Sequence, residues 1–217
     1  MELKGKKINV IGDSITEGVG TTGAEHRFCD ILAARSGATV RNYGISGTRI
    51  AVQQVKKDNV DFGLDFVTRA PQMDADADIV VVFGGTNDFG HGDAPFGCFE
   101  DRTGDTFCGA VHLLCRELLE RYPEAEIVFM TPTHRLNEDV PTGDNKPAPV
   151  GTLKQYVDML KRICEFYSLP VLDLYAAGRI QPKVDVIREK YMPDGLHPSD
   201  AGNELIAERL LAFLKAL

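Results

Sequence analysis

The sequence has no long apolar run, no C-x-x-C cysteine pair and no excess of basic residues. Only a few apolar residues separate the charged N-terminus from Gly12, too few for a signal-peptide core or a membrane span, so we expect a cytoplasmic protein without membrane contact. Five cysteines, an odd number, argue against a disulfide framework and a zinc site. A formal net charge of -8 gives no general attraction to nucleic acid.

Two catalytic signatures are also absent. No G-x-x-x-x-G-K-[ST] occurs, which excludes a P-loop nucleotide enzyme, and no G-x-S-x-G occurs, which disfavours the nucleophile elbow of α/β-hydrolases. The chain also lacks low-complexity tracts and internal repeats. Its 217 residues suffice for a sizeable core, so we expect one domain spanning residues 1–217.

Short β-rich apolar runs alternate with longer segments of helical periodicity. Strands are predicted at residues 8–11, 78–83, 126–130 and 170–172, with a weaker candidate at 38–42. Helices are predicted at about 25–36, 106–121, 152–167 and 199–217, the last with Ser199 as its N-cap. This alternation is typical of an α/β protein, a three-layer, flavodoxin-like α/β/α sandwich around a parallel sheet of about five strands.

Ligands of such sheets bind beyond the carboxyl ends of the strands, so the segments just after each strand are the ones of interest. They are Gly12-Asp13-Ser14, residues 44–48, residues 84–88, and a long loop at 132–150. We expect all four to lie along one rim of the sheet.

A serine nucleophile needs a neighbouring base, and the C-terminal part of the chain offers one. Asp194 and His197 are three residues apart with Gly195 between them, so the carboxylate can fold back onto one ring nitrogen and leave the other to face a serine. Ser14 is the preferred serine. Ser46 is a rival, but its surroundings read G-x-S-G-x.

Four blocks in order, Gly12-Asp13-Ser14, Gly47, 85–88 and Asp194-x-x-His197, resemble those of the SGNH or GDSL hydrolases. The resemblance covers residues 8–198. It implies that Ser14 attacks an ester carbonyl, that His197 is the general base and then acid, and that Asp194 orients the imidazole. It also implies an oxyanion hole made by the backbone N–H of Ser14, the backbone N–H of Gly47 and the side-chain amide of Asn87, without cofactor or metal.

Each block also has a purely structural interpretation. Ser14 could cap a helix, Asn87 could stabilise its own turn, and Asp194 with His197 could be a turn before the last helix. Asp13 and Asp88 are interpreted mainly as acceptors that fix loop N–H groups. A non-catalytic binding protein on the same scaffold is a further alternative, which nothing in the sequence favours.

A literal G-x-G-x-x-G, formed by Gly18, Gly20 and Gly23, is the dinucleotide-binding fingerprint. It does not follow the first strand directly, and the strand at 38–42 does not end in a ribose-binding acid. We therefore regard a dinucleotide-binding protein as the weaker alternative.

The family hosts esterases of acetylated sugars, lysophospholipases and thioesterases, so it leaves the acyl donor open. Long loops at 89–106 and 139–149 could form opposite walls of a pocket, or be oligomer contacts of a homo-oligomer. Their polar composition favours a small acyl group, such as acetyl, on a polar or carbohydrate-like alcohol. Candidate substrate contacts are Asp13, Thr48, His91, Phe96 and His134.

Overall fold

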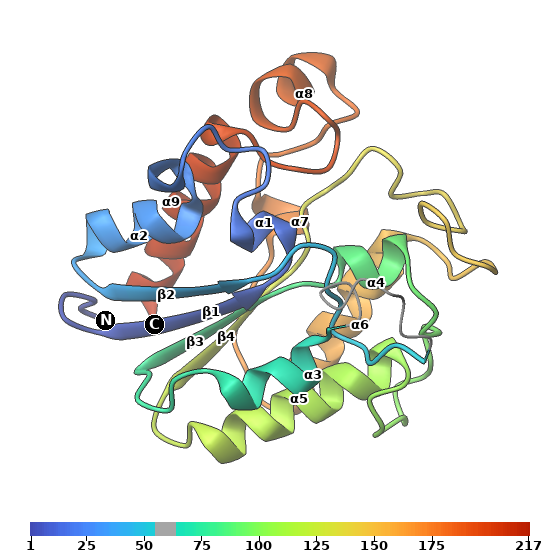
Figure 1. Cartoon of the computed structure of the whole chain (residues 1–217), viewed down its shortest axis with the longest axis horizontal. Helices are drawn as coiled ribbons and strands as arrows, with labels where there is room; N and C mark the ends of the chain where they lie inside the picture. Colours follow the sequence, from blue (N-terminus) through green and yellow to red (C-terminus); the bar gives the residue numbers. More distant parts are fainter. Residues whose placement is uncertain (55–63) are drawn as a thin grey trace.

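The computed structural model describes residues 1–54 and 64–217, and a five-stranded sheet lies at its centre (Figure 1). The strand order is β2-β1-β3-β4-β5, and every neighbouring pair is parallel. This confirms the predicted α/β class and parallel sheet. The strands are β1 (Lys7–Gly12), β2 (Thr39–Gly44), β3 (Ile79–Phe83), β4 (Glu126–Met130) and β5 (Val171–Leu172).

Helices cover both faces of the sheet (Figure 1). Side chains alternate along β3, so that Ile79, Val81 and Phe83 join one buried cluster while Val80 and Val82 join the other. The first cluster includes α2 (Phe28–Ser36) and α9 (Asp200–Ala216); the second includes α3 (Phe66–Arg69), α5 (Phe107–Arg121) and α6 (Leu153–Phe166). Because both faces are buried, the strand is apolar throughout, which is why it was readable from the sequence.

Several short elements were not predicted. They are α1 (Ser14–Glu17), α4 (Thr86–Gly90), α7 (Leu174–Ala177), α8 (Asp185–Tyr191) and the 3-10 turn η3 (Ala70–Gln72); another 3-10 turn, η1 (Ala24–His26), overlaps the start of the helix predicted at 25–36. One or two turns give no hydrophobic periodicity from which to recognise a helix. The helix predicted at 25–36 is split into η1 and α2, because Arg27 has an extended backbone between them.

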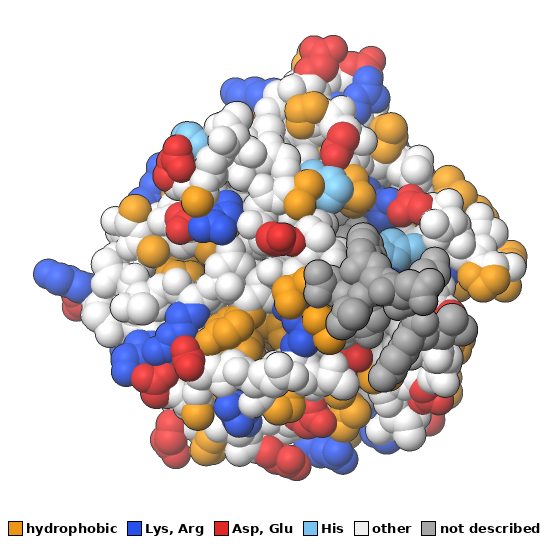
Figure 2. Space-filling view, in the orientation of Figure 1, with side chains coloured by type: hydrophobic (Ala, Val, Ile, Leu, Met, Phe, Trp, Pro, Cys, Tyr) orange, Lys and Arg blue, Asp and Glu red, His pale blue; other side chains and the backbone are white. Residues whose placement is uncertain are grey.

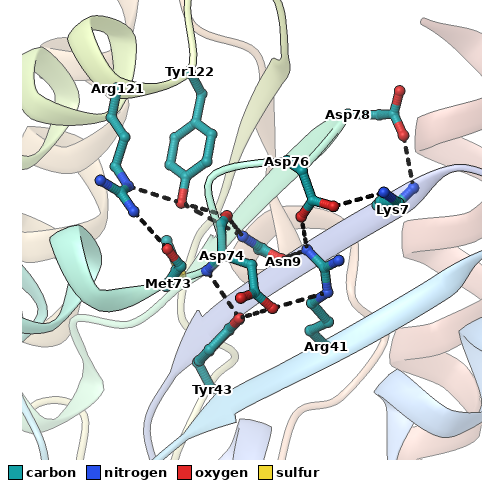
Figure 3. Close-up of polar contacts among 10 residues, drawn as sticks. All are labelled: Lys7, Asn9, Arg41, Tyr43, Met73, Asp74, Asp76, Asp78, Arg121 and Tyr122. Atoms are coloured by element: carbon teal, nitrogen blue, oxygen red, sulfur yellow. Dashed lines mark hydrogen bonds and ion pairs between the residues drawn. The ribbon is translucent and has the colours of Figure 1, made fainter.

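The loop that precedes β3 is tied to β1, β2 and the end of α5 by a polar network (Figure 3). The buried Asn9 side chain donates to the carbonyl of Asp74 at 2.7 Å, and the Tyr122 hydroxyl donates to the same oxygen at 3.0 Å. Asp76 accepts from the Arg41 guanidinium at 2.7 Å. These contacts give the Asp74 carbonyl two donors and hold the loop that leads into β3, which is a structural role.

Acidic and basic side chains are interspersed on the face of the molecule shown in Figure 2. No helix within the described part of the chain is long and apolar enough to cross a membrane.

Candidate active site

The carboxyl ends of β1, β2 and β3 bring three distant segments together. Gly12, the last residue of β1, pairs with Gly44 on one side and Phe83 on the other. Beyond the strands, the Ile45 N–H donates to the Gly12 carbonyl at 3.2 Å. The Asn87 side chain then donates to the Thr48 carbonyl at 3.0 Å. The segments after the three strands therefore form one connected rim, as expected.

Ser14 is the first residue of α1, and the neighbouring Asp13 is the residue that caps this helix. The Asp13 carboxylate accepts from the Ile15 N–H at 3.0 Å. Gly12 permits the tight turn, since a Cβ there would lie 1.9 Å from the Thr16 hydroxyl oxygen. With the cap supplied by Asp13, the Ser14 hydroxyl is free for another contact, and its Oγ lies 3.1 Å from His197 Nε2.

The Asp194-x-x-His197 segment folds back on itself as the spacing predicted. One carboxylate oxygen of Asp194 lies 2.7 Å from His197 Nδ1. The other accepts the backbone N–H groups of Leu196 at 2.8 Å and His197 at 2.7 Å. Gly195 provides the left-handed backbone of this turn, with φ of 80°.

This arrangement sets the charge of the acid and the tautomer of the ring. Burial by itself would raise the pKa of Asp194, but hydrogen bonds from the His197 N–H, the Leu196 N–H and the ring hold that pKa below its usual range. An ionised carboxylate only accepts hydrogen bonds, so Nδ1 of neutral His197 has the proton. Nε2 therefore presents a lone pair to the Ser14 hydroxyl.

Three candidate donors lie on the segments that meet at this rim. Within residues 1–54 and 64–217, the N–H groups of Ser14 and Gly47 have no hydrogen-bond acceptor. Gly47 has φ of 75°, a conformation that disfavours any side chain at this position. The buried Asn87 amide uses one of its two N–H bonds on the Thr48 carbonyl and retains the second. The structure thus brings together all three residues predicted for an oxyanion hole.

The rival serine faces elsewhere. The N–H of Ser46 donates to the Glu17 carboxylate at 2.6 Å, and its hydroxyl donates to the same oxygen. The Asp88 carboxylate also makes structural hydrogen bonds: its two oxygens accept the N–H groups of Ile50 and Ala51, each at 2.9 Å. Asp88 therefore holds the loop that follows Gly47 against α4.

The Gly18-to-Gly23 run lacks the setting of a dinucleotide fingerprint. Gly18 terminates α1, and Gly20 packs so closely against the C-terminal segment that a Cβ would lie 2.7 Å from the Pro198 carbonyl oxygen. The next α-helix begins only at Phe28. The run therefore opens no α-helix, and Gly23 caps only the three-residue 3-10 helix η1, which is too short to provide a phosphate-binding helix N-terminus. Instead, Gly20 lets the segment that follows α1 pack closely against His197.

The comparison with known families agrees with this geometry. The GDSL-like lipase/acylhydrolase family matches residues 10–205. The chain belongs to this family. It is therefore an enzyme that hydrolyses esters, and the resemblance noted in the sequence is confirmed.

Individual relatives cover nearly the whole chain. A GDSL lipase of Mycobacterium tuberculosis is 28% identical over 95% of this chain and 80% of its own length. A solved protein of Lactobacillus plantarum is 28% identical, with a TM-score of 0.83 over 99% of this chain and 98% of its own. A lipase/acylhydrolase of Enterococcus faecalis has the same fold, at 24% identity and a TM-score of 0.64 over 97% and 96% of the two chains. The fold is that of the SGNH hydrolases.

The remaining predicted site residues of this GDSL-type hydrolase make contacts within the protein. The Thr48 hydroxyl donates to the Ile45 carbonyl at 2.7 Å, which stabilises the turn behind Gly47. Phe96 packs on Tyr156, with ring centroids 4.7 Å apart. His134 Nδ1 lies 2.7 Å from the buried Glu138 carboxylate, and none of these contacts involves the triad.

Two buried arginines of the rim were not found from the sequence. The Arg69 guanidinium donates to the Gly12 carbonyl at 3.2 Å and to the Thr48 hydroxyl at 2.8 Å; burial lowers its pKa to about 10. Arg135 donates to the Thr86 carbonyl at 3.2 Å through Nη1, and its Nη2 lies 2.5 and 2.6 Å from the two carboxylate oxygens of Asp144. Neither arginine belongs to a short motif, so only the fold reveals that they support the loops after β1 and β3.

Asp13 provides a test of the buried charge next to Ser14. Burial raises its pKa to about 7 from an ordinary 3.8, with Asp88 adding to the effect. A folded-state pKa above the unfolded one means that the folded protein binds the extra proton between these values. The free energy of unfolding should therefore fall as pH rises from about 4 to about 7.

Asp13→Asn keeps an oxygen for the Ile15 N–H and removes the titration. Relative to wild type, we expect the variant to gain about 2–4 kcal/mol of unfolding free energy between about pH 5 and about pH 8, measured by urea denaturation. Asp158→Asn, at an exposed ion pair with Lys154, is the matched control and should show no such gain. An Asp13→Asn difference that is the same at both pH values would contradict the buried-charge interpretation.

Proposed function

We propose that this hydrolase is a serine esterase that forms an acyl-enzyme on Ser14, and that it acts on short, acetyl-type esters of a polar or carbohydrate-like alcohol. The observation that supports this best is the continuous chain from Ser14 Oγ to His197 Nε2 at 3.1 Å and from His197 Nδ1 to Asp194 at 2.7 Å. The spacing is within hydrogen-bond reach at both steps, as a nucleophile, its base and an orienting acid require.

In the first half of the reaction, Ser14 Oγ attacks the ester carbonyl while its proton passes to His197 Nε2. Asp194 stabilises the imidazolium that forms, and the carbonyl oxygen takes up negative charge. The N–H groups of Ser14 and Gly47 and the free N–H of Asn87 donate to that oxygen. The imidazolium then protonates the departing alcohol, which leaves the acyl group on Ser14.

In the second half, water gives a proton to His197 and its oxygen attacks the acyl carbon. The same three donors stabilise the second tetrahedral intermediate. When it collapses, the carboxylic acid departs and Ser14 Oγ recovers the proton from His197. Ser14 and His197 regain their starting protonation states and water supplies the hydrogen of the released alcohol, so the proposed cycle is complete without a cofactor.

The proposed substrate size rests on the two loops that the sequence singled out. Residues 92–96 and residues 146–150 line a common cavity of about 290 Å³. Its volume lies just below the usual range for small-molecule sites and its lining includes none of Ser14, Asn87 and His197, so it would take a small group extending from an ester bound at Ser14 and not a long acyl chain. Gly92 is one of the residues that line the cavity. It directly follows His91, whose ring contacts the Asn87 side chain.

The test combines covalent labelling with a chain-length series. A fluorophosphonate probe should modify Ser14, identified by mass spectrometry of the peptide, and Ser46→Ala should be labelled like wild type. Hydrolysis of p-nitrophenyl esters should be fastest for acetyl and decline with longer chains. Labelling at another residue would refute the nucleophile. An optimum at roughly eight carbons or more would indicate a lysophospholipase or thioesterase type of acylhydrolase instead.

A further inference from the structure

His91 lies where the last turn of α4 ends, four residues after Asn87. Its N–H donates to the Asn87 carbonyl at 2.9 Å, which brings the ring back along the helix. Nε2 of the ring then lies 3.2 Å from Asn87 Oδ1. On the other side of the ring, Nδ1 lies 2.8 Å from a guanidinium nitrogen of Arg49. Both ring nitrogens are therefore engaged with protein groups.

The chemistry of Arg49 decides which ring nitrogen has the proton. A guanidinium only donates hydrogen bonds, so Nδ1 of His91 must accept, and the proton of the neutral ring must be on Nε2. Nε2–H can only donate, so the Asn87 atom that faces it must be the oxygen. On the other side of that amide, the Thr48 carbonyl can only accept, and it faces the amide nitrogen at 3.0 Å. The two neighbours thus fix the same orientation of Asn87 independently.

The surroundings keep the ring neutral. Burial, together with the adjacent Arg49, lowers the pKa of His91 to about 4, and Lys146 and Arg135 act in the same direction while Asp144 opposes them. The ring is also held firmly. Gly92, with φ of 89°, lets the loop pack so closely that a Cβ there would lie 2.8 Å from Arg49 Cδ.

We propose that His91 is a positioning residue of the oxyanion hole: Arg49 selects its Nε2–H tautomer, and this ring holds Asn87 with its amide N–H toward the reacting carbonyl oxygen. The inference rests on the proposed esterase function and extends it. An amide rotated by half a turn would present its oxygen, which repels the oxyanion. His91 acts on the reaction only through Asn87, and it need not touch the substrate.

A double-mutant cycle in the full-length protein tests this role, with p-nitrophenyl acetate as substrate. Asn87→Ala removes a donor and should lower kcat by about 10²- to 10³-fold. His91→Leu should lower kcat by roughly 10- to 100-fold with KM changed by less than about threefold, because the donor remains but its amide is then held on one side only, by the Thr48 carbonyl. The double variant should be no slower than Asn87→Ala within about twofold. His91→Gln, whose amide can donate to Asn87, should recover most of kcat.

His112→Leu is the matched control. This histidine is buried on α5 and contacts the Tyr167 hydroxyl, outside the site, so its loss should leave kcat near the wild-type value. The tautomer of His91, read from ¹⁵N NMR of the wild-type ring, should be Nε2–H; this measurement does not depend on whether a variant folds.

The outcomes separate the two proposals. An active wild type with a slow Asn87→Ala, but with His91→Leu as fast as wild type or with additive losses in the double variant, would overturn the positioning role alone. An Nδ1–H tautomer would do the same. A wild type that hydrolyses no ester and is not labelled at Ser14 would overturn the esterase proposal, and the positioning role with it.

Discussion

Ser14→Ala should lower kcat for p-nitrophenyl acetate by about four powers of ten or more, with the fold intact. The hydroxyl that His197 faces at 3.1 Å is the only group lost, so the proposed base, orienting acid and oxyanion donors all remain in place. Without an attacking oxygen, their arrangement can assist only the slow direct attack of water. Steady-state kinetics, together with a fluorophosphonate labelling assay, measures the effect.

Two controls accompany this variant. Ser46→Ala removes the other rim serine, whose hydroxyl is bound to Glu17, and should retain wild-type kcat. Thermal unfolding of Ser14→Ala should stay close to wild type, because Asp13 and not Ser14 caps α1. Turnover by Ser14→Ala at more than about one hundredth of wild type would contradict Ser14 as the nucleophile.

The elements that could be predicted from the sequence are helices with a clear hydrophobic periodicity and strands that are buried on both faces. β3 and β4 were apparent because both faces of the sheet are covered, and α9 because Ser199 caps a long amphipathic helix. The short helices α1 and α4 were missed, since they are set by a capping residue and a glycine turn at a strand end and not by a repeating pattern. These two helices are the ones that present Ser14 and Asn87.

The same distinction applies within the site. Asp194 and His197 were predicted from their spacing, and Ser14 was predicted from its place among four blocks that resemble those of the family. The contact between Arg49 and His91 joins residues forty-two apart along the chain, and no motif links them. A weak signal did exist, since a histidine four residues after Asn87 can reach back along one helical turn. What the sequence could not reveal was the donor on the far side of the ring, which decides the tautomer.

Asp194→Asn is expected to be nearly as damaging as the loss of Ser14, by a mechanism that the turn geometry makes specific. One oxygen of Asp194 accepts the N–H groups of Leu196 and His197, and an asparagine must place its own oxygen there to keep those bonds. Its NH₂ group then faces His197 Nδ1, which has to accept. The ring proton moves to Nε2, and Nε2–H cannot take the proton of Ser14. We expect kcat to fall by roughly 10⁴-fold with little change in KM.

The decisive measurement is again the ring tautomer, because a loss of kcat alone could have several causes. In the wild type, ¹⁵N NMR of His197 should show Nδ1–H; in Asp194→Asn it should show Nε2–H, while thermal unfolding changes little since both backbone bonds persist. A variant that keeps more than about a tenth of wild-type kcat, or that retains Nδ1–H, would contradict the account. With the expected tautomers, the pairs Asp194–His197 and Arg49–His91 are two instances of one device: a neighbour with fixed hydrogen-bonding polarity sets a histidine tautomer, and through it the direction of a proton or an amide.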